Sequence, residues 1–326
     1  MRGPTPGLHA PGTRPITQNI RATAGRSQPM LEVPILGLSP ANPVIVGSGL
    51  LTDQERNIRR LLGKGAGAVV TKTIHPSPPQ GLDERILRLP VGMLNSTTYS
   101  KRSVNRWLKT LRSFADDRLP VIASLHADTP GELAMLAKDV ETTGCRALEL
   151  GISCLNEEDG LEDDNPDRVY AYTSEVRSKT ALPMSVKLAV GEGLRDRVRA
   201  AIAGGADAIT LSDTIAGAAV SPTTGRLELN GVFGYSGPGL KPLVLAAIWQ
   251  LRKSGIALPV MGCGGVSSGR DVADYLSVGA SVAQVYTALH TDMYRTLERI
   301  LAETRDLVGP QAAVPGSTEE AQEAAI

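Results

Sequence analysis

Three side chains that can do acid–base or electrostatic chemistry stand at the ends of apolar segments in this 326-residue sequence. Cys154 ends the run LELGISC, Lys72 follows AVVT, and Lys187 lies within MSVKL. A cysteine thiolate can take up a proton, although a lone cysteine is more often a small buried hydrophobic residue. A buried ammonium group needs an anionic partner. A core salt bridge would supply one, but two lysines at one site favour a cofactor that becomes negatively charged, such as a reduced flavin.

Two glycine-containing segments near the C-terminus could bind a phosphate group. They are GCGGVSSGRD (262–271) and VYTALH (285–290). The adjacent residues Gly264 and Gly265 would let backbone N–H groups come close to an anion, and the helix expected after Ser268 would direct its N-terminus toward it. The alternative is that these glycines only allow a tight turn. We favour the phosphate site.

Two sequence patterns alternate along the chain and predict the strands that carry these residues. In the first, a glycine in second place precedes small residues and an apolar run, as where a helix ends on a glycine cap before a buried strand. In the second, a proline stands at or near the start of the apolar run, which a strand tolerates. The first pattern occurs at 64–71, 143–150, 204–211 and 278–285, and the second at 42–46, 119–125, 182–188 and 258–264.

The spacing of these patterns predicts a (β/α)₈ TIM barrel. Each interval within a pattern has room for two strand–helix units of about 30 residues or more. The strands are continuous apolar runs, as expected when both faces of a parallel sheet are covered. Amphipathic helices are expected at 104–114, 132–140 and 195–203, and an N-terminal β-hairpin at 31–38 is expected to close the bottom of the barrel. A doubly wound Rossmann sheet is the alternative, but no GxGxxG follows the first strand.

The active site of a TIM barrel lies at the C-terminal ends of its strands. Cys154 is therefore expected to face the mouth of the barrel rather than the core. The predicted strand ends are Gly47–Gly49, Thr71–Thr73, His126, Gly151–Cys154, Lys187, Ser212–Thr214, Gly262–Gly265 and Tyr286–Thr287.

The composition argues against several classes of function. The 34 basic residues are balanced by 34 acidic residues, so no net charge favours a nucleic acid or an anionic membrane as partner. Three cysteines without a CxxC pair fit neither a disulfide framework nor a metal site, and they indicate a reducing, cytoplasmic setting. Residues 1–30 are expected to be a disordered leader, although their basic, acid-free composition also fits a transit peptide. Residues 31–309 would form the barrel and 310–326 a flexible tail.

Several motifs in order along residues 31–293 resemble the dihydroorotate dehydrogenase family of FMN-dependent barrels, particularly its soluble, cysteine-base class. Dihydropyrimidine dehydrogenase shares the same core, so the motifs indicate the chemistry more firmly than the substrate. The motifs are NPVIVGSG (42–49), VTKT (70–73), GMLN (92–95), LELGISCLN (148–156), VKL (186–188), SGPGLKP (236–242), GCGGVSSGRD (262–271) and GASVAQVYTA (279–288).

This resemblance implies a role for each residue at the mouth of the barrel. Cys154 matches the base that removes a proton from the carbon next to the hydride donor, and residues 155–166 match the loop that covers the substrate. Lys187 matches the lysine beside flavin N1 and O2, and Ser48 matches a residue near flavin N5. Lys72 matches a lysine that lies near both flavin and substrate and has a catalytic role. The remaining residues expected to bind FMN are Gly237, Gly264, Gly265, Tyr286 and Thr287.

The sequence departs from the family pattern where the substrate ring would bind. Asn95 and Asn156 match substrate-binding asparagines, but Gly151 replaces one asparagine, and Asp213, before Thr214, replaces another. An amide both donates and accepts hydrogen bonds, whereas an ionised carboxylate only accepts. We therefore expect Asn95, Asn156, Asp213 and Thr214 to bind a ring related to dihydroorotate but different from it.

The favoured hypothesis is an FMN oxidoreductase that forms or reduces a C–C double bond next to a carbonyl. Authentic dihydroorotate dehydrogenase activity is an alternative, and a flavin-free phosphate-binding isomerase or lyase is another. A tRNA dihydrouridine synthase is disfavoured by the zero net charge, and a catalytically inactive scaffold by the retained lysines and Cys154. We expect a small-molecule substrate and a homodimer. The sequence has no iron–sulfur cysteine cluster, so such a centre would belong to a separate electron-transfer partner.

Overall fold

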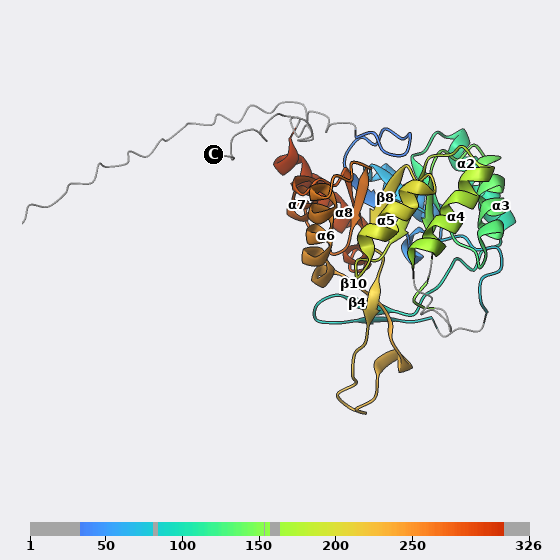
Figure 1. The fold of residues 1–326 in the computed structure, drawn as a ribbon. Helices are drawn as coiled ribbons and strands as arrows, with labels where there is room; N and C mark the ends of the chain where they lie inside the picture. The colour runs from blue at the N-terminus through green and yellow to red at the C-terminus, as the bar shows by residue number, and fades with distance from the viewer. Residues whose placement is uncertain (1–32, 81–83, 153, 157–163, 310–326) are drawn as a thin grey trace, which may run out of the picture.

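The structure is a computed structural model that describes residues 33–80, 84–152, 154–156 and 164–309 (Figure 1). Eight parallel strands form a closed barrel in the order β1-β12-β11-β8-β7-β6-β5-β2, which confirms the predicted TIM barrel. The leader expected at 1–30 and the tail expected at 310–326 lie outside the described residues. The barrel strands are β1 (Val44–Val46), β2 (Ala68–Val70), β5 (Val121–Leu125), β6 (Leu148–Gly151), β7 (Met184–Leu188), β8 (Ala208–Leu211), β11 (Val260–Cys263) and β12 (Val282–Val285).

Helices surround the barrel and cover its outer face (Figure 1). Several begin at a side chain that caps the first turn, because the hydroxyl or amide oxygen of Ser103, Thr129 or Asn165 accepts a hydrogen bond from the backbone N–H three residues later. The helices are α1 (Glu55–Gly63), α2 (Val104–Asp116), α3 (Pro130–Glu141), α4 (Pro166–Lys179), α5 (Leu194–Ala203), α6 (Lys241–Lys253), α7 (Gly269–Ser277) and α8 (Met293–Val308). The predicted amphipathic helices correspond to α2, α3 and α5.

The glycine pattern has the physical basis that the sequence suggested. Gly65, Gly144, Gly205 and Gly279 have φ values of 99°, 82°, 96° and 98°. This is the left-handed region in which a side chain is unfavourable, and glycine adopts it where a helix ends. Each of these glycines therefore ends a helix and directs the chain into the following barrel strand.

Apolar side chains close the N-terminal end of the barrel. Ile35, Leu36 and Leu38 are buried and pack with residues inside the barrel, including Ile45 and Met261. Ile35 and Leu38 exchange two backbone hydrogen bonds across a tight turn. This confirms the short hairpin expected at 31–38 for its described part, since residues 31 and 32 are not described.

A second, antiparallel sheet that the sequence patterns did not predict extends from the barrel in the order β3-β4-β10-β9 (Figure 1). Three of its strands are largely half-buried or exposed, whereas the barrel strands are almost entirely buried, so the continuous apolar runs that predicted the barrel strands do not mark β3, β9 and β10. The strands are β3 (Ile86–Arg88), β4 (Met93–Asn95), β9 (Ile215–Gly217) and β10 (Phe233–Ser236); short 3₁₀ helices are η1 (Leu50–Thr52), η2 (Glu228–Asn230), η3 (Pro238–Leu240) and η4 (Thr287–His290). Within the described residues, no helix is both long and apolar enough to span a membrane.

Candidate active site

A cavity of about 490 Å³ lies at the C-terminal ends of the barrel strands, where the active site of such a barrel is expected. The antiparallel sheet contributes Asn95 and Ser236 to its wall. Every residue that the sequence assigned to the site lines this one cavity. These residues are Ser48, Lys72, Asn95, Cys154, Asn156, Lys187, Asp213, Thr214, Gly237, Gly264, Gly265, Tyr286 and Thr287.

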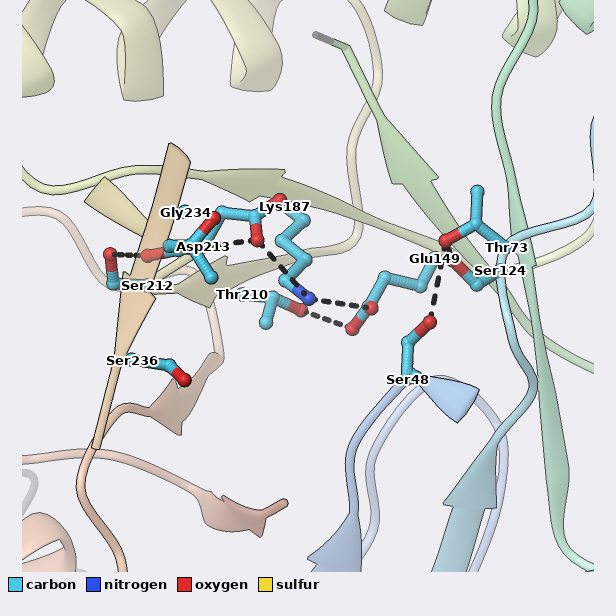
Figure 2. Close-up of polar contacts among 12 residues, drawn as sticks. Ser48, Thr73, Ser124, Glu149, Lys187, Thr210, Ser212, Asp213, Gly234 and Ser236 are labelled. Carbon is cyan, nitrogen blue, oxygen red and sulfur yellow. Dashed lines mark hydrogen bonds and ion pairs between the residues drawn. The ribbon is translucent and has the colours of Figure 1, made fainter. Parts of the chain in front are cut away.

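Lys187 lies between two carboxylates (Figure 2). Its Nζ is 3.8 Å from Glu149 Oε1 and 3.7 Å from Asp213 Oδ1. Burial lowers the pKa of Lys187, but the charges of Asp213 and Glu149 outweigh burial and raise this pKa well above its usual range. Lys187 is therefore a permanent positive charge at the cavity.

Glu149 is the partner that sequence reasoning missed, because it lies inside the apolar run LELG of β6. Its side chain is fully buried, and Oε2 accepts hydrogen bonds from Thr210 Oγ1 at 2.9 Å and from Gln284 Nε2 at 2.8 Å. Oε1 has no hydrogen-bond partner among the described residues and faces Lys187. One of the two carboxylates that balance the charge of Lys187 therefore belongs to a residue of the barrel core.

Lys72 follows β2 and is buried, with only 5% of its surface exposed. Burial lowers the pKa of Lys72, and the nearby positive charge of Lys187 lowers it further. Negative charge at Cys154, Glu84 and Asp53 acts in the opposite direction. Cys154 is partly buried and lies close enough to Lys72 for their charges to interact. The structure thus brings together the predicted base and a lysine that favours its thiolate form.

Ser48 belongs to a row of hydroxyl groups across neighbouring strands (Figure 2). Ser48 Oγ lies 3.3 Å from Thr73 Oγ1, which lies 3.0 Å from Ser124 Oγ. All three residues line the cavity. This row can orient a polar group of a bound molecule, because each hydroxyl can donate or accept.

Asn95 and Asn156 bind each other rather than standing as separate groups in the cavity. Asn156 Nδ2 donates to Asn95 Oδ1 at 3.2 Å and to Thr97 O at 2.8 Å. Asn156 Oδ1 accepts from the Gly234 N–H at 2.9 Å, and Asn95 Nδ2 donates to Gly234 O at 3.2 Å. These bonds join the loop after Cys154 to strands β4 and β10, so the two asparagines also have a structural role.

Asp213 and Thr214 follow β8 and are held mainly by backbone contacts. The Asp213 N–H donates to Leu188 O at 3.1 Å, and Asp213 Oδ1 accepts from the Thr214 N–H at 2.8 Å. The Asp213 side chain is 37% exposed. Its carboxylate is therefore fixed between Lys187 and the open cavity.

Three glycines form close-packed turns where the phosphate was predicted. Gly237, Gly264 and Gly265 have φ values of 115°, 139° and 72°. A Cβ atom on Gly265 would lie 2.8 Å from Gly237 O, and one on Gly237 would lie 2.5 Å from the Cα of Gly92. In the described part of the chain, the backbone N–H groups of Gly264 and Gly265 have no hydrogen-bond acceptor. They are therefore available to an anion.

The N-terminus of α7, which was expected to face the same anion, is already satisfied by side chains. Ser268 Oγ accepts from the Asp271 N–H at 3.2 Å, and Glu303 Oε2 accepts from the Gly269 N–H at 2.7 Å. Asp271 also receives a hydrogen bond from the Ser267 N–H. The expected contribution of this helix end is therefore wrong for the N–H groups of Gly269 and Asp271, because Glu303 of α8 and the capping residue Ser268 already accept their hydrogen bonds.

Tyr286 forms one wall of the cavity beside the first barrel strand. Its hydroxyl oxygen accepts a hydrogen bond from the Leu51 N–H at 3.3 Å, and burial raises the pKa of Tyr286 to about 12. A Cβ atom on Gly49 would lie 2.0 Å from the Tyr286 ring. Thr287 Oγ1 donates to Ser236 Oγ at 2.9 Å. Tyr286 and Thr287 thus position the turn after β12 rather than point freely into solvent.

A cluster of three aromatic rings that the sequence patterns did not assign lies beside Gly151. The ring centroid of Tyr99 is 4.5 Å from that of His75 and 5.0 Å from that of His126. His126 Nδ1 is 2.9 Å from Gly151 O, and burial lowers the pKa of His126 to about 4, so its ring is neutral. His126 and Tyr99 line the cavity. His126 was placed at a strand end but given no role.

His75, His126 and Asp128 offer atoms within 4.8 Å of one another, a spacing that could hold a metal ion. However, His75 Nδ1 accepts a hydrogen bond from the Ser77 N–H at 3.0 Å. Its Nε2 therefore carries the proton and donates to Asp128 Oδ1 at 3.2 Å. A metal at Nε2 would have to displace this proton, so the geometry favours a hydrogen-bonded cluster.

The described site fits FMN on three observations. The glycine turns offer free N–H groups to a terminal phosphate, Lys187 provides a fixed positive charge, and the row of hydroxyl groups that includes Ser48 lines the same cavity. Part of the loop expected to cover the substrate, residues 157–163, lies outside the described residues. Its described end is tied to the barrel, since Asp164 Oδ2 is 3.6 Å from Arg197 Nη1.

Comparison with known proteins places these features in a family. The family model for dihydroorotate dehydrogenase matches residues 30–308. The catalytic subunit of dihydroorotate dehydrogenase B (NAD(+)) from Pyrococcus horikoshii is 35% identical over 280 residues, which cover 83% of this chain and 90% of that relative. The corresponding subunit from Methanosarcina mazei is 34% identical over 275 residues, covering 82% and 87% of the two chains. A crystal structure of dihydroorotate dehydrogenase from Eimeria tenella with ferulenol has a TM-score of 0.74 at 20% identity, covering 88% of this chain and 86% of that one, and shares the fold.

Proposed function

The chain belongs to the dihydroorotate dehydrogenase family and is an oxidoreductase that acts on CH–CH bonds, and from this premise we propose that it uses FMN to oxidise or reduce a C–C bond next to a carbonyl in a small, dihydroorotate-like ring. The observation that carries the proposal is the convergence of Cys154, two lysines and the glycine turns on one cavity.

Cys154 is the proposed acid or base. When bound, FMN supplies the acceptor or donor of a hydride at its N5. The protein must then take a proton from the neighbouring carbon, or return one to it. Cys154 is the titratable thiol at the end of β6, and the positive charge of Lys72 stabilises its thiolate.

The other residues would hold the cofactor and the ring in place. Gly264 and Gly265 would bind the terminal phosphate through their backbone N–H groups, with Gly237 allowing the close approach of the two turns. Lys187 would stabilise negative charge on the flavin ring, and Ser48 would lie near flavin N5. Tyr286 and Thr287 would hold the turn after β12 against the cofactor site, since Tyr286 bonds the Leu51 N–H and Thr287 bonds Ser236 next to Gly237.

The proposed substrate differs from dihydroorotate because two amide positions have changed. At Gly151, the nearest atoms to an added Cβ would be 3.8–3.9 Å away, so a Cβ atom would fit there without a clash. Asp213 adds a carboxylate at the edge of the same cavity. A carboxylate-bearing ring would meet this charge without the donor that an asparagine supplies. Authentic dihydroorotate oxidation is the alternative, which the names of the relatives favour.

We also propose a separate electron-transfer subunit as partner. The relatives are named as catalytic subunits of an NAD(+)-linked enzyme. The sequence holds three cysteines, Cys145, Cys154 and Cys263, and they lie too far apart along the chain to resemble an iron–sulfur motif. Cofactors that carry electrons from the flavin to NAD(+) would then belong to the partner. The homodimer and the cytoplasmic location remain predictions.

The test begins with the purified protein. FMN should co-purify, and mass spectrometry of the released cofactor should identify it as FMN rather than FAD. The flavin-loaded protein is then mixed anaerobically with dihydroorotate, dihydrouracil and related rings, and reduction of the flavin is followed by its absorbance. A protein that binds no flavin under any reconstitution condition contradicts the proposal, and rapid reduction by dihydroorotate supports the alternative substrate.

A further inference from the structure

One ammonium group and two carboxylates lie close together at the cavity. One ammonium group, that of Lys187, lies 3.8 Å from the carboxylate of Glu149 and 3.7 Å from that of Asp213 (Figure 2). Only 14% of the Lys187 side chain is exposed. Because the two distances are nearly equal, neither carboxylate can be treated as the sole counterion.

Glu149 is the counterion that the barrel core supplies to Lys187. It is fully buried, and hydrogen bonds from Thr210 and Gln284 fix its carboxylate from the side facing the barrel interior. A buried ion pair of this kind is retained only when both partners are charged, because a single unpaired charge would be costly. Lys187 therefore has a permanent partner from the core before any molecule enters the cavity.

Asp213 is the additional charge. Its Oδ1 is held by the Thr214 N–H, and its carboxylate is more exposed than that of Glu149. An asparagine would fill the same volume and its Oδ1 could still accept this backbone hydrogen bond, so neither packing nor the turn requires a carboxylate. What the carboxylate adds is one negative charge close to Lys187.

We propose that Asp213 is a positioning residue that acts through Lys187. Its negative charge offsets part of the positive charge that Lys187 presents to the flavin, and this makes the bound flavin a stronger reductant. The inference rests on the proposed function, because it requires FMN at this cavity. Addition of two electrons and one proton to FMN leaves one extra negative charge on the flavin ring. A positive charge nearby stabilises that product, and a second negative charge beside Lys187 opposes this stabilisation.

The test is the two-electron reduction potential of the flavin-loaded protein, measured by spectroelectrochemical titration in the absence of substrate. Asp213→Asn should raise the potential by about 30 mV, which corresponds to an approximately tenfold shift of a two-electron equilibrium. Sulfite provides a second readout because it adds to flavin N5 and leaves a negative charge on the ring. Its affinity should rise by about tenfold in Asp213→Asn, for the same electrostatic reason.

Two further variants separate charge from structure. Asp213→Glu keeps the charge and should have a potential and a sulfite affinity close to those of the unmodified protein. Asp128→Asn removes a carboxylate that is 65% exposed and pairs with His75, and it should change neither quantity. If Asp213→Asn does not retain flavin, Asp213→Ser removes the same charge with a smaller side chain.

Each outcome has a distinct meaning. An unmodified protein that binds no flavin overturns the proposed function and this inference with it. A flavin-loaded protein whose potential is unchanged or lowered in Asp213→Asn overturns the inference alone, as does an Asp213→Glu variant that behaves like Asp213→Asn. A rise confined to the variants that lose the charge supports it.

Discussion

At the scale of single residues, Cys154 and Lys72 are the groups that we propose move a proton, and both line the same cavity. The two groups interact electrostatically, and Lys72 is held in a buried position beside the cavity. A positive charge there favours the thiolate, which is the form of cysteine that acts as a base. The charge of Lys72 therefore supports the predicted role of Cys154 independently of the position of Cys154 at the end of a strand.

Replacing Cys154 by alanine should therefore slow the reaction of flavin with substrate by roughly 10²- to 10⁴-fold, the usual contribution of a positioned acid or base. Flavin content should stay unchanged, and Cys154→Ser should keep slightly more activity. Stopped-flow absorbance of the flavin measures both rates. Cys145→Ala is the matched control, because Cys145 is a buried cysteine outside the cavity. A Cys154→Ala variant with the rate of the unmodified protein would show that another group moves the proton.

The proposal that the substrate differs from dihydroorotate can be tested at Gly151 and Asp213. Restoring two amides by Gly151→Asn and Asp213→Asn should raise turnover of dihydroorotate, because each recovered hydrogen bond to a buried polar ligand contributes about 1–3 kcal/mol. Together they could improve its binding by roughly 10²-fold or more. Steady-state kinetics with dihydroorotate measures the change. Gly151→Ala is the control that adds a Cβ without an amide. Efficient turnover of dihydroorotate by the unmodified protein would contradict the proposed change of substrate.

The sequence predicted which residues line the cavity, but not what most of them contact. Residues at strand ends must converge in a barrel, so Lys187 and Cys154 could be placed from the strand pattern alone. Glu149 could not be identified in this way, because a carboxylate within an apolar run gives no sign of the lysine that lies beside it on a neighbouring strand. Asn95 and Asn156 likewise gave no indication that they bind each other.

At the scale of elements, the turns after β10 and β11 would form the proposed anion site, with little contribution from the start of α7. The two glycine turns pack backbone against backbone, so that a Cβ on Gly265 would lie 2.8 Å from Gly237 O. In the first turn of α7, by contrast, side chains already accept hydrogen bonds from backbone N–H groups. The second sheet was also missed from the sequence. It consists of two local strand pairs, β3 with β4 and β9 with β10, which are joined into one sheet by the pairing of β4 with β10. No local pattern predicts this pairing, because β4 and β10 lie more than a hundred residues apart.

The role of Gly265 can be tested against Gly255, which has a similar φ value but no atom close to the position of an added Cβ. Gly265 and Gly255 have φ values of 72° and 81°, and a Cβ on Gly255 would meet no atom within 4 Å. Alanine at Gly255 should destabilise the fold by about 1–2 kcal/mol, the cost of a side chain in the left-handed region. Alanine at Gly265 should cost more, because its Cβ would also lie 2.8 Å from Gly237 O. Only Gly265→Ala should also weaken FMN binding, by about tenfold or more, since a lost backbone contact to a charged group costs about 1.5–3 kcal/mol.

Recovery of flavin fluorescence on dilution of the loaded protein measures the affinity for FMN, and urea unfolding of the apoprotein measures the stability. Equal flavin affinities in Gly265→Ala and Gly255→Ala would show that the turn after β11 does not bind the phosphate. A loss of affinity in both variants, in proportion to their loss of stability, would point to a general effect on the barrel instead.

At the scale of the whole molecule, the barrel separates the groups that fix stability from those that perform chemistry. The cavity and its charges lie at the C-terminal ends of the strands, while the apolar cluster of Ile35, Leu36 and Leu38 fills the N-terminal end. The strand pattern sufficed to predict this division, because parallel strands with helical connections place all strand ends of one kind on one side.

Leu38→Ala should therefore lower stability without changing the chemistry. Leu38 is buried against residues inside the barrel, and removing such a side chain costs about 2–5 kcal/mol. Urea unfolding measures this loss. Leu307→Ala is the matched control, because Leu307 is 52% exposed and should change stability by no more than about 0.5 kcal/mol. At a temperature where Leu38→Ala remains folded, its flavin reduction potential and its rate with substrate should equal those of the unmodified protein. A shift in either would show that packing at the bottom of the barrel reaches the charges around Lys187.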